Sequence, residues 1–340
     1  MQNEIKEVQR LLDEKGCIIN PGYAKKMLWE YDRKDIKAGK LRIKEWDYYL
    51  IVNDDYGIAF TVADNSYLGF VSVSLLDFKE KSYEMFSTMK LLTLGKYNLP
   101  SSSLKGDIHY KDKKISLSYV VKDGKRMISC DIPNFKDSKP LKAEIVLDKI
   151  PDESMVIATP FEKKKAFYYN QKINCMNANG TVTYDDKKIV FKNHYGVLDW
   201  GRGVWTYDNT WFWATASGMI DKVPFGFNLG YGFGDTKAAS ENMLFYNGKA
   251  HKLDQVLFDI PKKGKTYDFL KPWKYTSNDQ RLDLTFTPIL DRKDKISILM
   301  ILSDQHQVFG KFNGTVVLDD GTKLKVKDLL GSAEVVHNKW

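Results

Sequence analysis

Two carboxylates near a tryptophan-rich stretch of this chain have the side-chain chemistry of proton donors. Asp199 directly precedes Trp200 and Arg202, and Glu241 leads into a later run of strand-forming residues. A carboxyl group held among indole rings loses hydration, which disfavours its charged form. Such a group can act as a general acid near neutral pH. Asp199 and Glu241 are therefore the candidate catalytic residues.

Arg202 supports a second interpretation of the same residues. Its guanidinium could pair with Asp199, Glu45 or Glu241 and close a β structure without taking part in a reaction. Flanking glycines and tryptophans predict that Arg202 is desolvated and stacked on an indole face. Both interpretations, structural and functional, remain open from the sequence alone.

The stretch from Tyr195 to Asp235 is typical of a pocket wall. It holds 11 aromatic residues and 8 of the 23 glycines, and four of the eight tryptophans fall within residues 200–213. Flat apolar rings beside residues that let the backbone bend suit a ligand pocket. A packed core between two halves of the molecule is the alternative. The candidate ligand-binding residues are Glu45, Trp46, Asp47, Trp200, Arg202, Trp205, Trp211, Trp213, Asn228 and Tyr231.

Other kinds of site find little support in the sequence. The five histidines are scattered, so no metal site is expected, although distant strands could still assemble one. The glycines of residues 230–234 lack the strand–turn–helix context of a dinucleotide fingerprint, and no cofactor is expected. Ser217 is not preceded by the Gly-x of a nucleophile elbow.

Composition limits the partners and the compartment. The net charge of +8 comes from lysines scattered along the chain, away from the aromatic stretch. Nucleic-acid binding is therefore not expected, because it favours basic stripes interleaved with stacking aromatics. Weak contact with anionic membrane surfaces remains open. Three unclustered cysteines and the absence of an apolar leader predict reduced thiols and a cytoplasmic location. The oligomeric state is left open.

Strand signals dominate after a short N-terminal segment. Residues 5–12 have the apolar spacing of an amphipathic helix ending at Gly16, and residues 23–31 suggest a second short helix. From Lys44 onward, alternating strands are separated by turns such as Asp123-Gly124 and Asn247-Gly248. This pattern predicts a mainly β protein with two consecutive antiparallel barrel-like or sandwich halves. The expected divisions are a helical segment at 1–40, a first domain at 41–160 and a second domain at 161–340.

Six segments spread over the whole chain carry a family resemblance. They are LLDEKGCIINPGYA (11–24), RIKEWDYYLI (42–51), LDWGRGVWTY (198–207), NLGYGFGD (228–235), SENMLFYNGKAHKLDQV (240–256) and GSAEVVHNKW (331–340). With them the chain resembles the family called domain of unknown function 2804. That family is distantly similar to the lipocalin-like superfamily of hydroxyneurosporene synthase, tocopherol cyclase and fungal Diels–Alderases.

The resemblance implies two consecutive β-barrel-like domains with an apolar pocket at their junction. It also implies a ligand of the isoprenoid, polyene or other lipid-like class. No catalytic residue carries over, because the shared motifs do not extend residue by residue to those enzymes. The leading hypothesis is binding of a hydrophobic small molecule. The alternatives are an enzyme that hydrates, cyclises or isomerises such a ligand with acid assistance, and a structural protein with a packed aromatic core.

Overall fold

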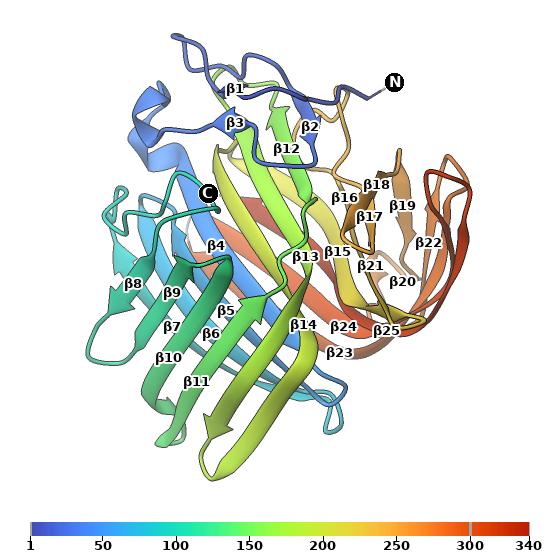
Figure 1. Cartoon of the computed structure of the whole chain (residues 1–340). Coiled ribbons are helices and arrows are strands. Elements are labelled where there is room, and N and C mark those ends of the chain that lie inside the picture. Colours follow the sequence, from blue (N-terminus) through green and yellow to red (C-terminus); the bar gives the residue numbers. More distant parts are fainter. Residues whose placement is uncertain (1, 299–300, 340) are drawn as a thin grey trace.

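Two large antiparallel β-sheets form the body of the protein in a computed structural model that describes residues 2–298 and 301–339 (Figure 1). The strands of the first sheet are β2 (Gly22–Ala24), β4 (Ile43–Val52), β5 (Tyr56–Asp64), β6 (Leu68–Asp77), β7 (Ser82–Leu91), β8 (Ile108–Lys111), β9 (Ser116–Lys122), β10 (Lys125–Lys136), β11 (Lys139–Asp148), β12 (Met155–Pro160), β13 (Phe167–Tyr184) and β14 (Lys187–Val204). Their order is β7-β6-β5-β4-β14-β13-β11-β10-β9-β8, with β12 paired to both β13 and β2.

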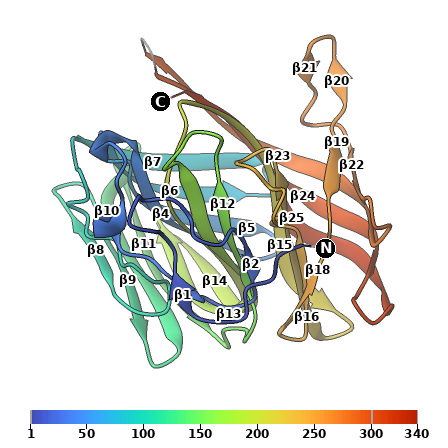
Figure 2. The same ribbon diagram turned by 90° about the horizontal axis from the view of Figure 1, so that it is seen from above.

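The second sheet lies beside the first, and both sheets curl (Figure 2). Its strands are β15 (Asp208–Ile220), β16 (Val223–Tyr231), β17 (Met243–Tyr246), β18 (Lys249–Lys252), β19 (Val256–Asp259), β22 (Trp273–Ser277), β23 (Leu282–Ile298), β24 (Ile301–Val317) and β25 (Lys323–Lys339). Their order is β18-β17-β16-β15-β25-β24-β23-β22-β19. A separate hairpin pairs β20 (Lys262–Lys263) with β21 (Thr266–Tyr267). The predicted mainly β fold with two antiparallel halves is confirmed.

Tight turns join neighbouring strands where the sequence predicts them. Asp123 and Gly124, between β9 and β10, both have positive φ angles of 51° and 69°. Asn247 and Gly248, between β17 and β18, have φ angles of 49° and 77°. Two consecutive left-handed residues match the right-handed twist of a two-residue hairpin, and Asp, Asn and Gly adopt this conformation readily.

The predicted N-terminal helices are wrong. In the described residues the only helical segments are two 3-10 turns, η1 (Arg33–Asp35) and η2 (Lys40–Arg42). Residues 5–12 are extended and include β1 (Gln9–Arg10), which pairs in parallel with β3 (Trp29–Glu30). The reason is tertiary, because the backbone of this segment bonds to residues 23–30 while Ile5, Leu11 and Leu12 pack into the core of the first sheet.

The described part of the chain contains no helix with the length and apolar character needed to cross a membrane.

The change from the first sheet to the second falls between Val204 and Asp208. Strands β13 and β14 extend the first sheet, since β13 pairs with β11 and β14 pairs with β4. The predicted join between residues 160 and 161 does not coincide with this change of sheet. As a boundary between folding units, it stays a prediction.

A bulge in β13 fastens the two sheets together. The side-chain amide of Asn174 donates hydrogen bonds to Thr215 Oγ1 at 2.8 Å and to the backbone oxygen of Phe227 at 3.0 Å. The backbone amide of Cys175 donates to Ser217 Oγ at 3.0 Å. Because Asn174 and Cys175 belong to the first sheet and their partners to the second, these bonds hold the halves in a fixed relation.

Candidate functional site

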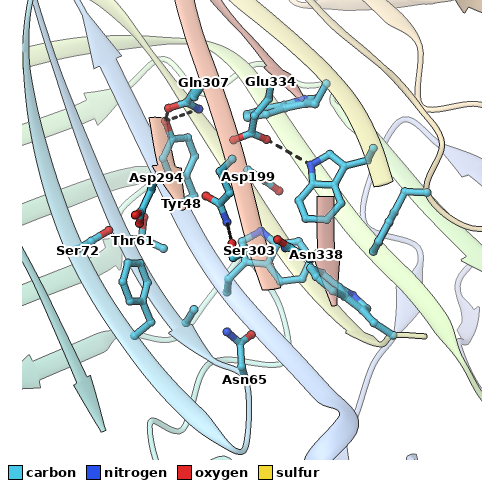
Figure 3. Close-up of a pocket in the computed structure, with 18 of the residues that line it drawn as sticks. Tyr48, Thr61, Asn65, Ser72, Asp199, Asp294, Ser303, Gln307, Glu334 and Asn338 are labelled. Atoms are coloured by element: carbon cyan, nitrogen blue, oxygen red, sulfur yellow. Dashed lines mark hydrogen bonds between the residues drawn. The ribbon is translucent and has the colours of Figure 1, made fainter. Parts of the chain in front are cut away.

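A cavity of about 260 Å³ lies between the two sheets. Figure 3 shows Tyr48, Thr61, Ser72 and Asp199 of the first sheet facing Ser303, Gln307, Glu334 and Asn338 of the second. This volume is slightly below the range of about 300–1,000 Å³ that is usual for small-molecule pockets, which are concave and often lie at junctions of this kind. The cavity is therefore the strongest candidate for a functional site.

Strand register places a row of polar side chains on the first-sheet side of the cavity. Lys172 of β13 pairs with Asp199 of β14, which pairs in turn with Tyr48 of β4. Tyr48 pairs with Thr61 of β5, and Thr61 pairs with Ser72 of β6. Residues directly opposite in a sheet point to the same face, so five strands each contribute one polar group to this row.

The second sheet contributes a facing row. Arg292, Gln307, Glu334 and Trp213 lie opposite one another on β23, β24, β25 and β15. Gln307 Nε2 donates a hydrogen bond to Tyr48 Oη at 3.2 Å and so joins the two rows across the cavity. The polar part of the cavity is therefore built jointly by both sheets.

An aromatic wall forms another side of the cavity. Trp205 is central to it, with ring centroids 5.3 Å from Trp46, 5.7 Å from Trp211 and 4.8 Å from Phe233. Gly201 makes room for this wall, because a Cβ at that position would lie 2.0 Å from Trp46 Cζ2. The missing side chain of Gly201 therefore leaves space for the Trp46 ring.

Asp199 is held as a hydrogen-bond acceptor inside the cavity. Lys172 Nζ lies 2.7 Å from Asp199 Oδ1, and Asn170 Nδ2 donates to the same oxygen at 2.7 Å. The Lys172 ammonium also lies over the ring of Trp213, 4.4 Å from its centroid. This ion pair presents a lysine and a carboxylate side by side to any bound molecule.

Glu241 also lines the cavity, and its carboxyl group is buried. Burial raises the pKa of Glu241 above its ordinary value, opposed mainly by the Lys172 charge and by a hydrogen bond from Asn228. Asn228 also accepts a hydrogen bond from Trp213 Nε1 at 2.7 Å, which fixes the orientation of its amide. Gly230 leaves space for the acid, since a Cβ there would lie 2.6 Å from Glu241 Oε1.

Glu334 is a carboxylic acid that lines the cavity and that was not predicted from the sequence. Burial raises its pKa to about 7, while the Arg292 charge and a hydrogen bond from Trp211 act in the opposite direction. Trp211 Nε1 donates that bond to Glu334 Oε2 at 3.4 Å. A signal was present in the sequence, because Glu334 is the one charged residue in the run LLGSAEVV at 329–336.

The predicted site residues divide between the cavity and other parts of the protein. Those lining the cavity are Trp46, Asp199, Trp205, Trp211, Trp213 and Glu241. Those with other positions are Glu45, Asp47, Trp200, Arg202, Asn228 and Tyr231. Asn228 lies behind Glu241, and the ring of Tyr231 stacks on Phe212 with centroids 4.7 Å apart.

Arg202 lies on the opposite face of β14 from the cavity and is fully buried. Its Nη2 lies 2.9 Å from Asp47 Oδ1, and its Nε lies 3.9 Å from Glu45 Oε1. The guanidinium stacks 4.2 Å from the centroid of the Trp200 ring. The predicted desolvation, stacking and pairing are confirmed, with Asp47 and Glu45 as the carboxylate partners.

Within residues 2–298 and 301–339, no three His, Cys, Asp or Glu side chains gather in a group that could hold a metal ion. The five histidines are His109, His194, His251, His306 and His337.

Solved structures with the same architecture cover nearly the whole chain. A putative AttH from Nitrosomonas europaea aligns with a TM-score of 0.52 and 12% identity, covering 90% of this chain and 96% of its own. CghA, in a structure with Sch210972, aligns with a TM-score of 0.54 and 8% identity, covering 97% of both chains. These likenesses confirm the expected two-sheet, lipocalin-like fold.

No curated protein matches the chain in sequence. A family model described as a domain of unknown function (DUF2804) matches residues 2–340, so the chain belongs to that family.

Proposed function

We propose that this protein binds a small amphipathic molecule, with an isoprenoid, polyene or other lipid-like body, in the cavity between its sheets. One observation carries the proposal: the cavity combines a wall of tryptophans with two facing rows of polar side chains. Indole rings favour an apolar or unsaturated body, and a few placed polar groups orient its polar end. The CghA structure with Sch210972 is a precedent for a small molecule with this fold.

A pocket-filling substitution tests binding. Thr61 points into the cavity, so Thr61→Trp should occupy the space and abolish binding (Figure 3). Val190→Trp, at an exposed position of β14, is the matched control. Isothermal titration calorimetry with a panel of fatty acids, isoprenoid alcohols and polyenes should show saturable one-to-one binding to the wild type and to Val190→Trp only.

Two results would contradict the proposal. One is the absence of binding across the panel. The other is equal binding by a folded Thr61→Trp variant, which would place the ligand outside this cavity.

Acid-assisted catalysis on the bound ligand is the second candidate function. It is favoured by two carboxyl groups, Glu241 and Glu334, that face one cavity and whose pKa values burial raises. A protonated carboxyl group could transfer its proton to an alkene carbon, leaving a carbocation on the neighbouring carbon. The tryptophan faces would stabilise that cation, at roughly 0.5–2 kcal/mol for each contact. Asp199 would accept the proton that the cation loses from an adjacent carbon, as the electrons of that C–H bond form the new double bond.

Substitution of the acids separates catalysis from binding. Glu241→Gln, Glu334→Gln and Asp199→Asn should leave the affinity for the panel ligand nearly unchanged. Loss of a general acid should lower turnover of that ligand by about 10²–10⁴-fold, measured by chromatography of products. Glu144→Gln, at an exposed position of β11, is the control. Parallel loss of affinity and turnover would instead indicate a structural role for the acids.

A further inference from the structure

Exposed leucines gather at one end of the first sheet. Leu91 ends β7, Leu92 and Leu94 follow it, and the three are 80%, 57% and 42% exposed. Leu41 of η2 is also exposed. Together with exposed Met89 they form the surface called here the leucine rim. Figures 1 and 2 both show the blue 3-10 turns beside the teal segment that follows β7.

The turn between β5 and β6 brings the parts of the leucine rim together. The backbone amides of Leu92 and Leu94 donate hydrogen bonds to the oxygens of Tyr67 and Ser66, at 2.8 Å and 2.9 Å. On the other side of the same turn, Lys44 Nζ donates to the oxygens of both Leu41 and Asn65. These bonds hold the backbone of Leu41, Leu92 and Leu94 around one turn, at the same end of the first sheet.

The backbone of the leucine rim is held in an unusual conformation. Leu92 and Leu94 have positive φ angles of 54° and 52°, which are uncommon for bulky residues and cost free energy. Buried Asp64 fixes this conformation, since its carboxylate accepts hydrogen bonds from Thr93 Oγ1 at 2.8 Å and from the amide of Gly95 at 3.0 Å. Thr93 consequently points inward while both leucines point outward.

Lysines lie beside the leucine rim. Residues 88–114 contain six lysines and two aspartates, a net charge of +4. Lys90, Lys96 and Lys111 line a surface hollow together with Leu91 and Leu92. Exposed apolar side chains bordered by lysines are suited to the interface of a membrane that contains anionic lipids, where both kinds of side chain find favourable surroundings.

The leucine rim also borders the cavity between the sheets. Met89 belongs to the rim and also lines the cavity. Leu68 of the neighbouring strand lines the cavity too, and it pairs with Leu91 of the rim. Asn65, in the turn that supports the rim, lines the cavity as well. The lining of the cavity therefore reaches the leucine rim.

We propose that the leucine rim docks this protein on the surface of membranes containing anionic lipids, with the cavity opening toward the bilayer. The docking surface stands on its own exposed leucines and charge. Exchange of a ligand between bilayer and cavity rests on the proposed function.

Vesicle co-sedimentation tests docking with a variant designed to keep its fold. Leu91→Ser, Leu92→Asn and Leu94→Asn are combined, because asparagine tolerates the left-handed conformation that leucine adopts at cost. The matched control combines Leu257→Ser and Leu270→Ser, two exposed leucines of the other half. Wild type and control should bind vesicles of equal parts phosphatidylcholine and phosphatidylserine. The rim variant should bind at least tenfold more weakly.

Further measurements make the outcome unambiguous. Wild-type binding should fall when salt is raised or phosphatidylserine is omitted, because the lysines act through screened charge. Thr61→Trp should bind vesicles as the wild type does. The rim variant should keep its affinity for a soluble panel ligand, measured by calorimetry. Failure of docking and failure of cavity binding are therefore distinguishable. Absence of wild-type binding, or equal binding by the folded rim variant, would overturn the proposal and leave a protein partner as the occupant to seek.

Discussion

Arg202→Ala is expected to lower the free energy of unfolding by about 3–5 kcal/mol or to prevent folding, the range found when one partner of a buried ion pair is removed. The substitution leaves the Asp47 carboxylate without the Nη2 group that lies 2.9 Å away. It also removes the cation that stacks on Trp200 and donates to the backbone oxygens of Trp46 and Pro100. Urea denaturation followed by circular dichroism measures the loss.

Two comparisons make this result specific. Arg202→Lys should also destabilise the protein, because lysine lacks the planar fork that bonds several acceptors at once. Arg10→Ala removes an exposed pair with Asp35 at 3.3 Å, and pairs of this kind contribute about 0–1 kcal/mol. If Arg202→Ala is no less stable than Arg10→Ala, the buried network does not stabilise the fold.

Glu334→Gln is expected to change how stability depends on pH. Burial raises the pKa of Glu334 from 4.5 to about 7 in the folded protein, so the folded state binds more protons than the unfolded state between these values. Wild-type stability should therefore fall, relative to the glutamine variant, as the pH rises from 4.5 to 7. The difference should reach at most about 3 kcal/mol above pH 7, given 1.36 kcal/mol for each pH unit.

Urea denaturation of wild type and Glu334→Gln at pH 5 and at pH 8 measures this effect. The wild type should be the less stable protein at pH 8 by a margin that shrinks at pH 5. A difference in unfolding free energy that is the same at both pH values would show that the pKa of Glu334 is not raised in the folded protein.

The alternation of side chains along strands is the most informative property of the sequence. By this rule Glu45 and Asp47 share one face of β4 and Trp46 lies on the other. Both carboxylates indeed lie beside Arg202, while Trp46 lines the cavity. The same rule places Asp199 and Arg202 on opposite faces of β14. Asp199 faces the cavity, and Arg202 is buried on the other face. Alternation along a strand therefore suffices to divide these candidate residues between two faces, although it does not say which face borders a cavity.

Other features depend on contacts that local sequence does not encode. Glu334 reaches the cavity because β25 lies between β15 and β24, and that strand order is set by long-range pairing. The N-terminal segment has the apolar spacing of a helix, yet its backbone pairs with residues 23–30 instead. In both cases tertiary contacts override the local pattern.

A crystal structure of the wild-type protein with its tightest panel ligand would show directly where the ligand binds. We expect it between the two sheets, with its apolar body against Trp46 and Trp211 and its polar end near Tyr48 and Glu334. A ligand bound beside Arg202, on the face of β14 opposite the cavity, would contradict this expectation.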